Sequence, residues 1–237
     1  MSLTYRALAL FLTYPSDQTR ALTPAAAAVL SQDEGIPPPI RGALAKLAQE
    51  LLTGDLFEAQ ERFVWLFDRT RSLSLNLYEH VHGESRDRGQ AMVDLLELYR
   101  SKGLELSANE LPDHLPVFLE FLSTLPDQEA TSLLAEAGHV LHALGERLHR
   151  RGSSYRAVFG ALAARAGEEA DSEVLRAMLA EPDDDPDDLE AMDKLWEETA
   201  VTFGPSDVGC PKADALVRAM ESQTPPAADR RLGVAAA

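Results

Sequence analysis

Residues Tyr78–Ser123 read YEHVHGESRDRGQAMVDLLELYRSKGLELSANELPDHLPVFLEFLS, and the spacing of their apolar side chains predicts two amphipathic helices. In each half of the stretch, apolar residues recur at i, i+3, i+4 and i+7, which places them on one face of a helix. The two sets are Met92, Leu95, Leu96 and Tyr99, ahead of Gly103, and Leu115, Phe118, Leu119 and Leu122, after Pro112. We expect a loop over Leu104–Leu111 between the two helices.

The same helical period continues on both sides of this stretch. Glycines, prolines and capping residues mark where each periodic segment starts or stops. Asp55 precedes one segment as a candidate N-cap, and a further helix is expected over about 154–166. The periodic sets are Leu3, Ala7, Leu10 and Phe11; Leu44, Leu47, Ala48 and Leu51; Leu56, Ala59, Phe63, Leu66 and Phe67; and Leu134, Ala137, Leu141, Leu144 and Leu148.

One segment departs from this pattern, because Leu73, Leu75 and Leu77 alternate with polar residues. Alternation is typical of a strand, but no second alternating run exists to pair with it. An unpaired strand would leave its backbone polar groups unsatisfied, so we interpret the segment as a turn or broken helix. The predicted fold class is all-α, a single-domain helical bundle of roughly eight to ten helices.

The composition changes after residue 170. Residues 1–170 are predicted to form the helical domain, with a core that starts at residue 3 and ends at about residue 166. Glu181–Asp188 reads EPDDDPDD, in which like charges repel one another and prolines interrupt a helix. We expect an acidic linker and short helices over 171–220 and a disordered tail over 221–237.

The chain is strongly acidic, with 22 Lys and Arg against 39 Asp and Glu and a formal net charge of −17. This charge repels nucleic-acid phosphates and anionic lipid, so it argues against nucleic acid as a partner and favours a basic peptide. The single cysteine, Cys210, cannot form an internal disulfide or a thiolate zinc site. The apolar run Ala7–Leu12 is too short for a signal peptide and no segment is long enough to span a membrane, so we expect a cytoplasmic protein.

Two groups of histidines have the composition of a metal site. His80 and His82 with Glu84 offer two imidazoles and a carboxylate, but alternate residues in a loop rarely complete a site without a third His or Cys positioned by the fold, and Gly83 is expected to make the segment mobile. A second set, His139, His142 and Glu146, lies on the polar side of an amphipathic helix, where solvated histidines are ordinary. We favour the structural interpretation of both sets and expect no metal and no bound cofactor.

The run Glu84–Gly89 alternates charge at a predicted helix start. Ser85 is a candidate N-cap, and Asp87 suits the positive end of the helix dipole. Arg86 and Arg88 lie at the end of the helix that is unfavourable for cations, so we expect both to pair with carboxylates. Carboxylates of neighbouring elements and carboxylates of a partner explain the arginines equally well.

The segment Pro112–Pro116 starts the next predicted helix. Asp113 is a candidate cap, and Pro116 falls in the first turn, where a missing N–H costs little. Asp113 and His114 could support general-base chemistry, which leaves a small hydrolase as an alternative function. However, the chain has no nucleophile motif and no glycine-rich phosphate loop, so we do not expect an enzyme.

Several segments, in this order along the chain, resemble one protein family. It is the nitrate reductase delta-subunit type of molybdenum oxidoreductase maturation chaperone, within the TorD-like group. The resemblance spans about a quarter of the chain, and its most specific part is the His-Gly-Glu-Ser-Arg-Asp-Arg-Gly run. The matching segments are Phe63–Asp68, Ser72–Leu75, His82–Gln90 and Glu110–Pro116.

This resemblance implies a TorD-like helical fold and a non-catalytic chaperone that retains no cofactor. Its implied partner is the nitrate reductase catalytic subunit, bound through its N-terminal peptide and held ready for molybdenum cofactor insertion and membrane assembly. A structural subunit of a larger assembly is the other alternative, and we expect a monomer or weak homo-oligomer.

We expect the loop around His82–Gly89 and the segment Pro112–Pro116 to meet in space and to border the partner groove. An acidic helical protein with apolar stripes suits a basic amphipathic segment. The predicted partner-binding residues are His80, His82, Glu84, Arg86, Asp87, Arg88, Asp113, His114, Pro116 and Phe118.

Overall fold

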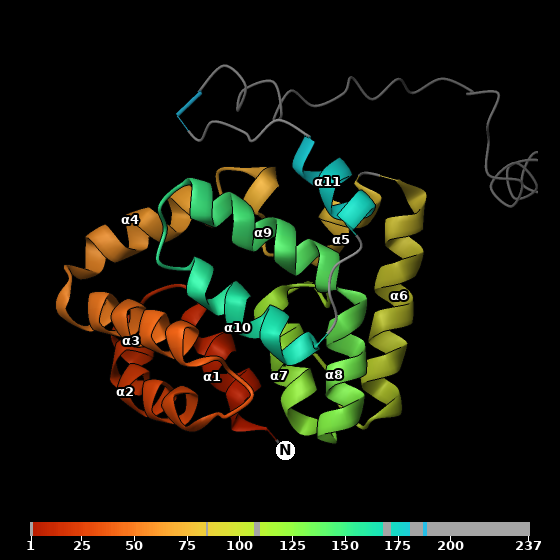
Figure 1. Cartoon of the computed structure of the whole chain (residues 1–237). Coiled ribbons are helices and arrows are strands. Elements are labelled where there is room, and N and C mark those ends of the chain that lie inside the picture. Colours follow the sequence, from red (N-terminus) through yellow and green to blue (C-terminus); the bar gives the residue numbers. More distant parts are fainter. Residues whose placement is uncertain (1, 84, 107–109, 168–171, 181–186, 189–237) are drawn as a thin grey trace, which may run out of the picture. The chain divides into compact units, whose positions relative to one another are not determined.

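The computed structural model describes residues 2–83, 85–106, 110–167, 172–180, 187 and 188. Within these ranges the chain forms eleven α-helices and one short 3-10 helix, and it contains no β-strand (Figure 1). The prediction of an all-α, single-domain bundle is therefore confirmed. The predicted linker and tail over 171–237 lie outside the described residues, apart from the helix over 172–180 and residues 187 and 188.

The helices follow one another closely along the chain. They are α1 (Leu3–Phe11), α2 (Asp17–Gln32), α3 (Pro38–Thr53), α4 (Leu56–Phe67), η1 (Arg71–Leu73), α5 (Leu77–His82), α6 (Arg86–Ser101), α7 (Leu115–Thr124), α8 (Asp127–Glu136), α9 (Gly138–Arg150), α10 (Arg156–Ala166) and α11 (Ser172–Ala180).

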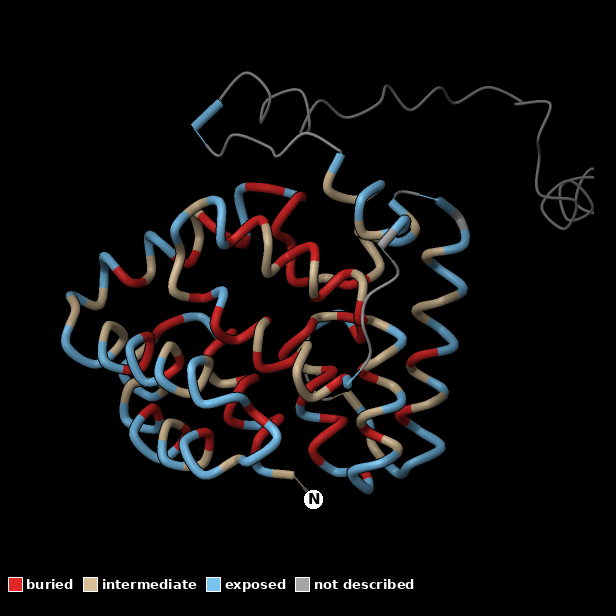
Figure 2. Tube along the Cα trace, viewed as in Figure 1, coloured by how far each residue is buried: buried red, intermediate tan, exposed pale blue. Residues whose placement is uncertain are grey.

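Helices α7 and α10 supply much of the hydrophobic core. Both carry apolar or small side chains on most of their circumference, so each can be covered by neighbours on several sides. Helix α1 packs on α7, while α10 packs on α9, α3 and α8, and Figure 2 shows buried residues along α9 and α10. The buried core side chains run from Tyr5 to Ala166, close to the predicted extent of the core.

Glycine allows α9 and α10 to approach closely. A Cβ atom added at Gly145 of α9 would lie 3.3 Å from the Cβ of Phe159 on α10. On the other side of α10, a Cβ at Gly160 would lie 3.5 Å from Ile40 of α3. A side chain at Gly145 would therefore require α9 and α10 to shift, whereas a methyl group at Gly160 would make an ordinary van der Waals contact.

Most predicted helix positions agree with the structure, with two corrections. The set Leu134, Ala137, Leu141, Leu144 and Leu148 was predicted as one continuous stripe but is divided between α8 and α9, because the backbone leaves the helical conformation at Ala137. The second correction concerns α1. Leu3 was placed on the buried face but is 60% exposed, because it lies at the open first turn of the helix. Tyr5 and Leu8, which are fully buried, complete the buried face instead. The predicted cap of α4 is confirmed, since the Asp55 carboxylate accepts hydrogen bonds from two amides of the first turn.

The alternating segment Leu73–Leu77 is a broken helix, as predicted. It runs from η1 into α5, and all three leucines are buried although no strand forms. An isolated antiparallel bridge joins Asn76 to His114, and Leu115 N donates to Leu75 O at 2.8 Å. The backbone groups that made an unpaired strand improbable therefore find partners at the start of α7.

Arg147 is a charged residue inside the apolar stripe of α9. It is only 3% exposed, and its guanidinium donates to Ser72 O of η1 at 2.8 Å and to Met178 O of α11 at 2.7 Å. These bonds join three helical elements that are far apart in the sequence. A buried guanidinium with several donors suits this role because it can satisfy carbonyls in different directions.

We predict that Arg147→Leu lowers the free energy of unfolding by about 3 kcal/mol, because the buried Ser72 carbonyl and the partly buried Met178 carbonyl lose their donor. Urea unfolding followed by circular dichroism measures this loss. The matched control is Arg150→Leu on the same helix, whose side chain is half exposed and 3.4 Å from Glu146. That exposed pair should contribute less than about 1 kcal/mol, so equal losses in the two variants would contradict the structural role of Arg147.

Candidate functional site

Asp113 lies where the start of α5 meets the start of α7. Its side chain has no exposed surface, and its carboxylate Oδ2 accepts a hydrogen bond from Tyr78 N at 3.0 Å. The Asp113 carbonyl also accepts from Leu77 N at 3.1 Å. Asp113 was predicted to cap its own helix, but it caps α5 across the fold instead, because His114 occupies the N-cap position of α7.

A second contact ties the C-terminal half of α6 to the same place. The Tyr99 hydroxyl donates to Pro112 O at 2.6 Å, and the Tyr99 ring lies 4.4 Å from the ring of Phe121 on α7. Burial raises the pKa of Tyr99, which keeps the hydroxyl a donor. The segment before α7 therefore anchors α5 and α6 together.

Electrostatic influences on the Asp113 carboxylate oppose one another. Burial raises its pKa, while the hydrogen bond from the Tyr78 amide and the nearby Arg88 guanidinium lower it. Arg88 itself forms an ion pair with Glu79 of α5, with 3.0 Å between Nη2 and Oε1. Arg88 is therefore paired with a carboxylate of a neighbouring element of the same chain.

The remaining residues of the charged run lie at or just before the start of α6. Asp87 is exposed on the first turn of α6, and Ser85 is the N-cap residue, although its side chain makes no capping hydrogen bond. Arg86 begins the helix, but its side chain and the whole of Glu84 lie outside the described residues.

The three histidines of this region contact different groups. His80 Nε2 lies 2.8 Å from Ser74 O, the His82 ring packs edge-on against Tyr78 with centroids 5.6 Å apart, and His114 Nδ1 lies 3.6 Å from a Glu110 oxygen. Among the described residues, no group of three or more His, Cys, Asp or Glu is arranged to hold a metal ion.

An apolar groove with acidic residues in its lining lies beside this anchored region. It has a volume of about 330 Å³ and is bounded by α5, α6 and the helices α7, α8 and α9; we call it the α5–α6 groove. Two carboxylates, Asp94 and Glu136, lie among its apolar residues. Its main apolar lining comes from Leu77, Val81, Leu95, Leu98, Phe118 and Val140.

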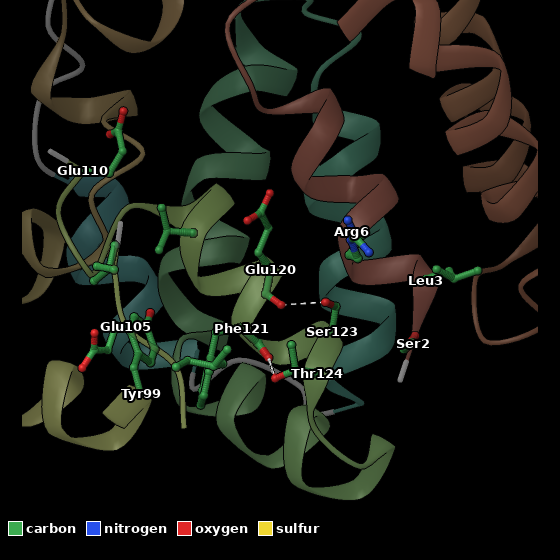
Figure 3. A pocket seen from close by; sticks show the side chains of 13 residues that line it. Ser2, Leu3, Arg6, Tyr99, Glu105, Glu110, Glu120, Phe121, Ser123 and Thr124 are labelled. Carbon is green, nitrogen blue, oxygen red and sulfur yellow. Dashed lines mark hydrogen bonds between the residues drawn. The ribbon is translucent and has the colours of Figure 1, made fainter. Parts of the chain in front are cut away.

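A second cavity, of about 420 Å³, lies between α1, α7 and the segment after α6; we call it the α1–α7 cavity (Figure 3). Leu3, Val117 and Phe121 contribute apolar surface, and Figure 3 also places Arg6 and Glu120 in its lining. Unlike the α5–α6 groove, this cavity contains a cation of its own.

The structure brings only part of the predicted site together. Phe118 lines the α5–α6 groove, whereas Pro116 is buried in the first turn of α7. Sequence reasoning missed Val81, which is 51% exposed on α5 and lines the groove. Its position between two histidines gave a weak signal, because an exposed apolar side chain in a polar segment suggests a contact surface.

Comparison with known proteins places the chain in a family. The family described as nitrate reductase delta subunit matches residues 33–161, more than half of the chain. The nitrate reductase molybdenum cofactor assembly chaperone NarJ of Escherichia coli (strain K12) is 43% identical over 183 residues, which cover 76% of this chain and 76% of the relative. The chain belongs to the nitrate reductase delta subunit family.

Two further relatives carry related names. The probable nitrate reductase molybdenum cofactor assembly chaperone NarW of the same strain is 44% identical over 160 residues, covering 68% of this chain and 69% of the relative. A probable chaperone NarJ of Bacillus subtilis (strain 168) is 27% identical over 156 residues, covering 65% and 82%. These names describe assembly chaperones and not catalysts, and this comparison confirms the expectation of a non-enzyme.

The geometry at Asp113 also gives no support to a hydrolase. Its carboxylate is enclosed and accepts from the Tyr78 amide, so it is not available to a substrate.

No described helix is long and apolar enough to cross a bilayer.

We predict that Asp113→Ala lowers the free energy of unfolding by about 3 kcal/mol, because the amide of Tyr78 loses a buried charged acceptor. Asp113→Asn keeps an oxygen acceptor at the same place and should lose less than half as much. Urea unfolding of the two variants measures the difference. If the two variants lost equal amounts of stability, the charge of the carboxylate would be the stabilising factor and the hydrogen bond to Tyr78 N would not.

We also predict a pH effect at His114. Burial lowers the pKa of His114 below its ordinary value of 6.5, with Glu110, Asp113 and Asp68 opposing the shift. Below pH 6.5 the unfolded chain therefore binds a proton that the native chain does not, so the contribution of His114 to stability falls as the pH drops through 6.5.

Urea unfolding of the wild type and of His114→Gln at about pH 7.5 and about pH 5.5 tests this sign. The wild type should lose more stability than the variant on acidification. A wild type that gains stability relative to the variant would show that Glu110 and its neighbours favour protonated His114.

Proposed function

We propose that this protein is a cytoplasmic chaperone that binds the N-terminal segment of the nitrate reductase catalytic subunit. It would keep the apoenzyme competent for molybdenum cofactor insertion and for assembly of the membrane-bound complex. The relatives' names support the chaperone role, and the observation that carries the binding mode is the α5–α6 groove.

The groove has the composition expected of a site for an amphipathic helix. Apolar side chains from five helices converge in it, so a peptide can insert anchors spaced at i, i+3 and i+4. Val81 is half exposed at its edge and would gain burial when the peptide binds. An apolar groove that is already formed also reduces the ordering cost of association.

The charges of the groove favour a basic peptide. Asp94 and Glu136 lie among its lining residues, and the whole chain has a formal charge of −17. Acidic groups at the margin of an apolar site orient a basic segment and accelerate its association. The α1–α7 cavity is acidic too, because Glu105, Glu110 and Glu120 outnumber Arg6 in its lining, so the two sites are distinguished by variants and not by charge.

The predicted partner-binding residues take different parts in this proposal. Phe118 would contact the peptide directly from the floor of the groove. Asp113 acts as a positioning residue, because it holds the N-terminus of α5 and with it the groove wall formed by Leu77 and Val81. His80, His82, Asp87, Arg88, His114 and Pro116 are proposed to border the site, while Glu84 and the Arg86 side chain lie outside the described residues.

We predict that the isolated protein binds a peptide copied from the N-terminus of the catalytic subunit, and that Val81→Asp weakens this binding at least about tenfold. Isothermal titration calorimetry at three temperatures measures the affinity and should give a negative heat-capacity change, since apolar area is buried. The matched control is Leu3→Asp, an exposed apolar residue that lines the other cavity. This variant should bind like the wild type.

The binding of the two variants decides which cavity holds the client peptide. If Leu3→Asp abolished binding and Val81→Asp did not, the client would lie in the α1–α7 cavity. If binding produced no heat-capacity change, an apolar groove would not be the recognition element. A permanent, inseparable complex with no measurable exchange would favour a structural subunit over a chaperone.

A further inference from the structure

A basic cavity lies on another part of the described fold, between α3, α4 and the turn from α9 to α10. Its volume is about 460 Å³, which is within the usual range for small-ligand sites. None of its residues lines the α5–α6 groove or the α1–α7 cavity. The residues that give it its character are Lys46, Arg62, Trp65, His149, Arg151 and Arg156.

The cationic lining is unusual for this chain, which has 22 Lys and Arg against 39 Asp and Glu. Four of those cations line one cavity, while Glu50 is the carboxylate among its lining residues. Glu50 lies 3.9 Å from both Lys46 Nζ and Arg62 Nη1, and it also accepts from the hydroxyl of Ser154. One carboxylate therefore serves two cations at long distance, which leaves the lining with a net positive charge.

A carboxylate from a distant part of the chain lies next to this cavity. Asp187 Oδ1 accepts a hydrogen bond of 3.2 Å from the indole N–H of Trp65, across 122 positions of sequence. The guanidinium of Arg151 lies over the same indole, 5.5 Å from the ring centroid. Trp65 thus has an anion at its edge and a cation on its face, which is the polarity that its quadrupole prefers.

Two independent observations therefore indicate an anionic ligand: the excess of cations around the cavity and the acidic group of the chain itself beside it. We propose that the basic cavity is a binding site for a compact, phosphate-bearing anion and that Asp187 competes with that ligand. Arginine guanidinium groups bind phosphate oxygens through paired hydrogen bonds, and Lys46 adds a point charge. The competing carboxylate makes ligand affinity depend on Asp187.

The test uses inorganic tripolyphosphate and the full chain with Trp196→Phe, which leaves Trp65 as the single tryptophan. Trp65 fluorescence should change saturably with tripolyphosphate. The double variant Arg62→Gln/Arg156→Gln should lose at least about tenfold in affinity, because two charge-assisted contacts are removed. The matched control, Arg6→Gln/Arg100→Gln, removes the same charge elsewhere and should bind like the parent protein.

Equal losses in the two arginine variants would overturn the site, because the effect would then come from net charge alone. An absence of any saturable response in the parent protein would overturn it too. Citrate, a carboxylate anion, is titrated in parallel. Binding of citrate as tight as that of tripolyphosphate would overturn the assignment to phosphate.

A second pair of variants tests the competition. Asp187→Asn should bind tripolyphosphate about fivefold more tightly, whereas Glu34→Gln, which changes the net charge equally, should not. If both variants bind as the parent protein does, Asp187 is not a competitor. Thermal melts of every variant establish that only folded protein is compared.

Discussion

The hydrogen bond from the Tyr78 amide to the buried carboxylate of Asp113 is the constraint on which the proposed site depends. A buried carboxylate is costly unless hydrogen bonds and charges compensate it, and here burial is the largest influence on its pKa. The first turn of a helix offers free amides and the positive end of the helix dipole. Because α5 is only six residues long, this tertiary cap contributes more to its position than its own internal hydrogen bonds can.

The position of α5 in turn defines one wall of the α5–α6 groove. Leu77 is held by its backbone bond to Asp113, and Val81 follows one turn later on the same face. The residue before Asp113, Pro112, accepts a hydrogen bond from the Tyr99 hydroxyl of α6 through its carbonyl. Helices α5 and α6 are therefore both attached to the same short segment. A groove built from several helices keeps its shape only if those helices share an anchor, and Pro112 and Asp113 provide it.

Sequence periodicity was sufficient for the helices but not for the contacts between them. The spacing of Leu115, Phe118 and Leu122 correctly predicted α7, since a helical stripe is a local property. The cap was assigned to the wrong helix because Asp113 precedes α7 in sequence and contacts α5 only in the folded chain. Arg147 was not predicted as buried, since a charged residue in an apolar stripe is normally solvated and its carbonyl partners are 75 and 31 positions away.

The candidate site was predictable only as a region. The family motifs led to the neighbourhood of α5 and α7, yet the groove combines residues as separated as Val81, Phe118 and Glu136, whose convergence depends on tertiary packing. Net charge had the same limitation, since a value of −17 predicts attraction of cations but does not reveal a cavity with several cations of its own.

The two proposed sites therefore illustrate different ranges of electrostatic interaction. Net charge acts over roughly a Debye length, about 8 Å at physiological ionic strength, and governs encounter with a basic peptide. Within a few ångströms, however, Lys46 and the arginines of the basic cavity outweigh the distant carboxylates. Added salt should consequently slow peptide association through the overall field, while selectivity at the basic cavity depends on direct contacts between its cations and the ligand.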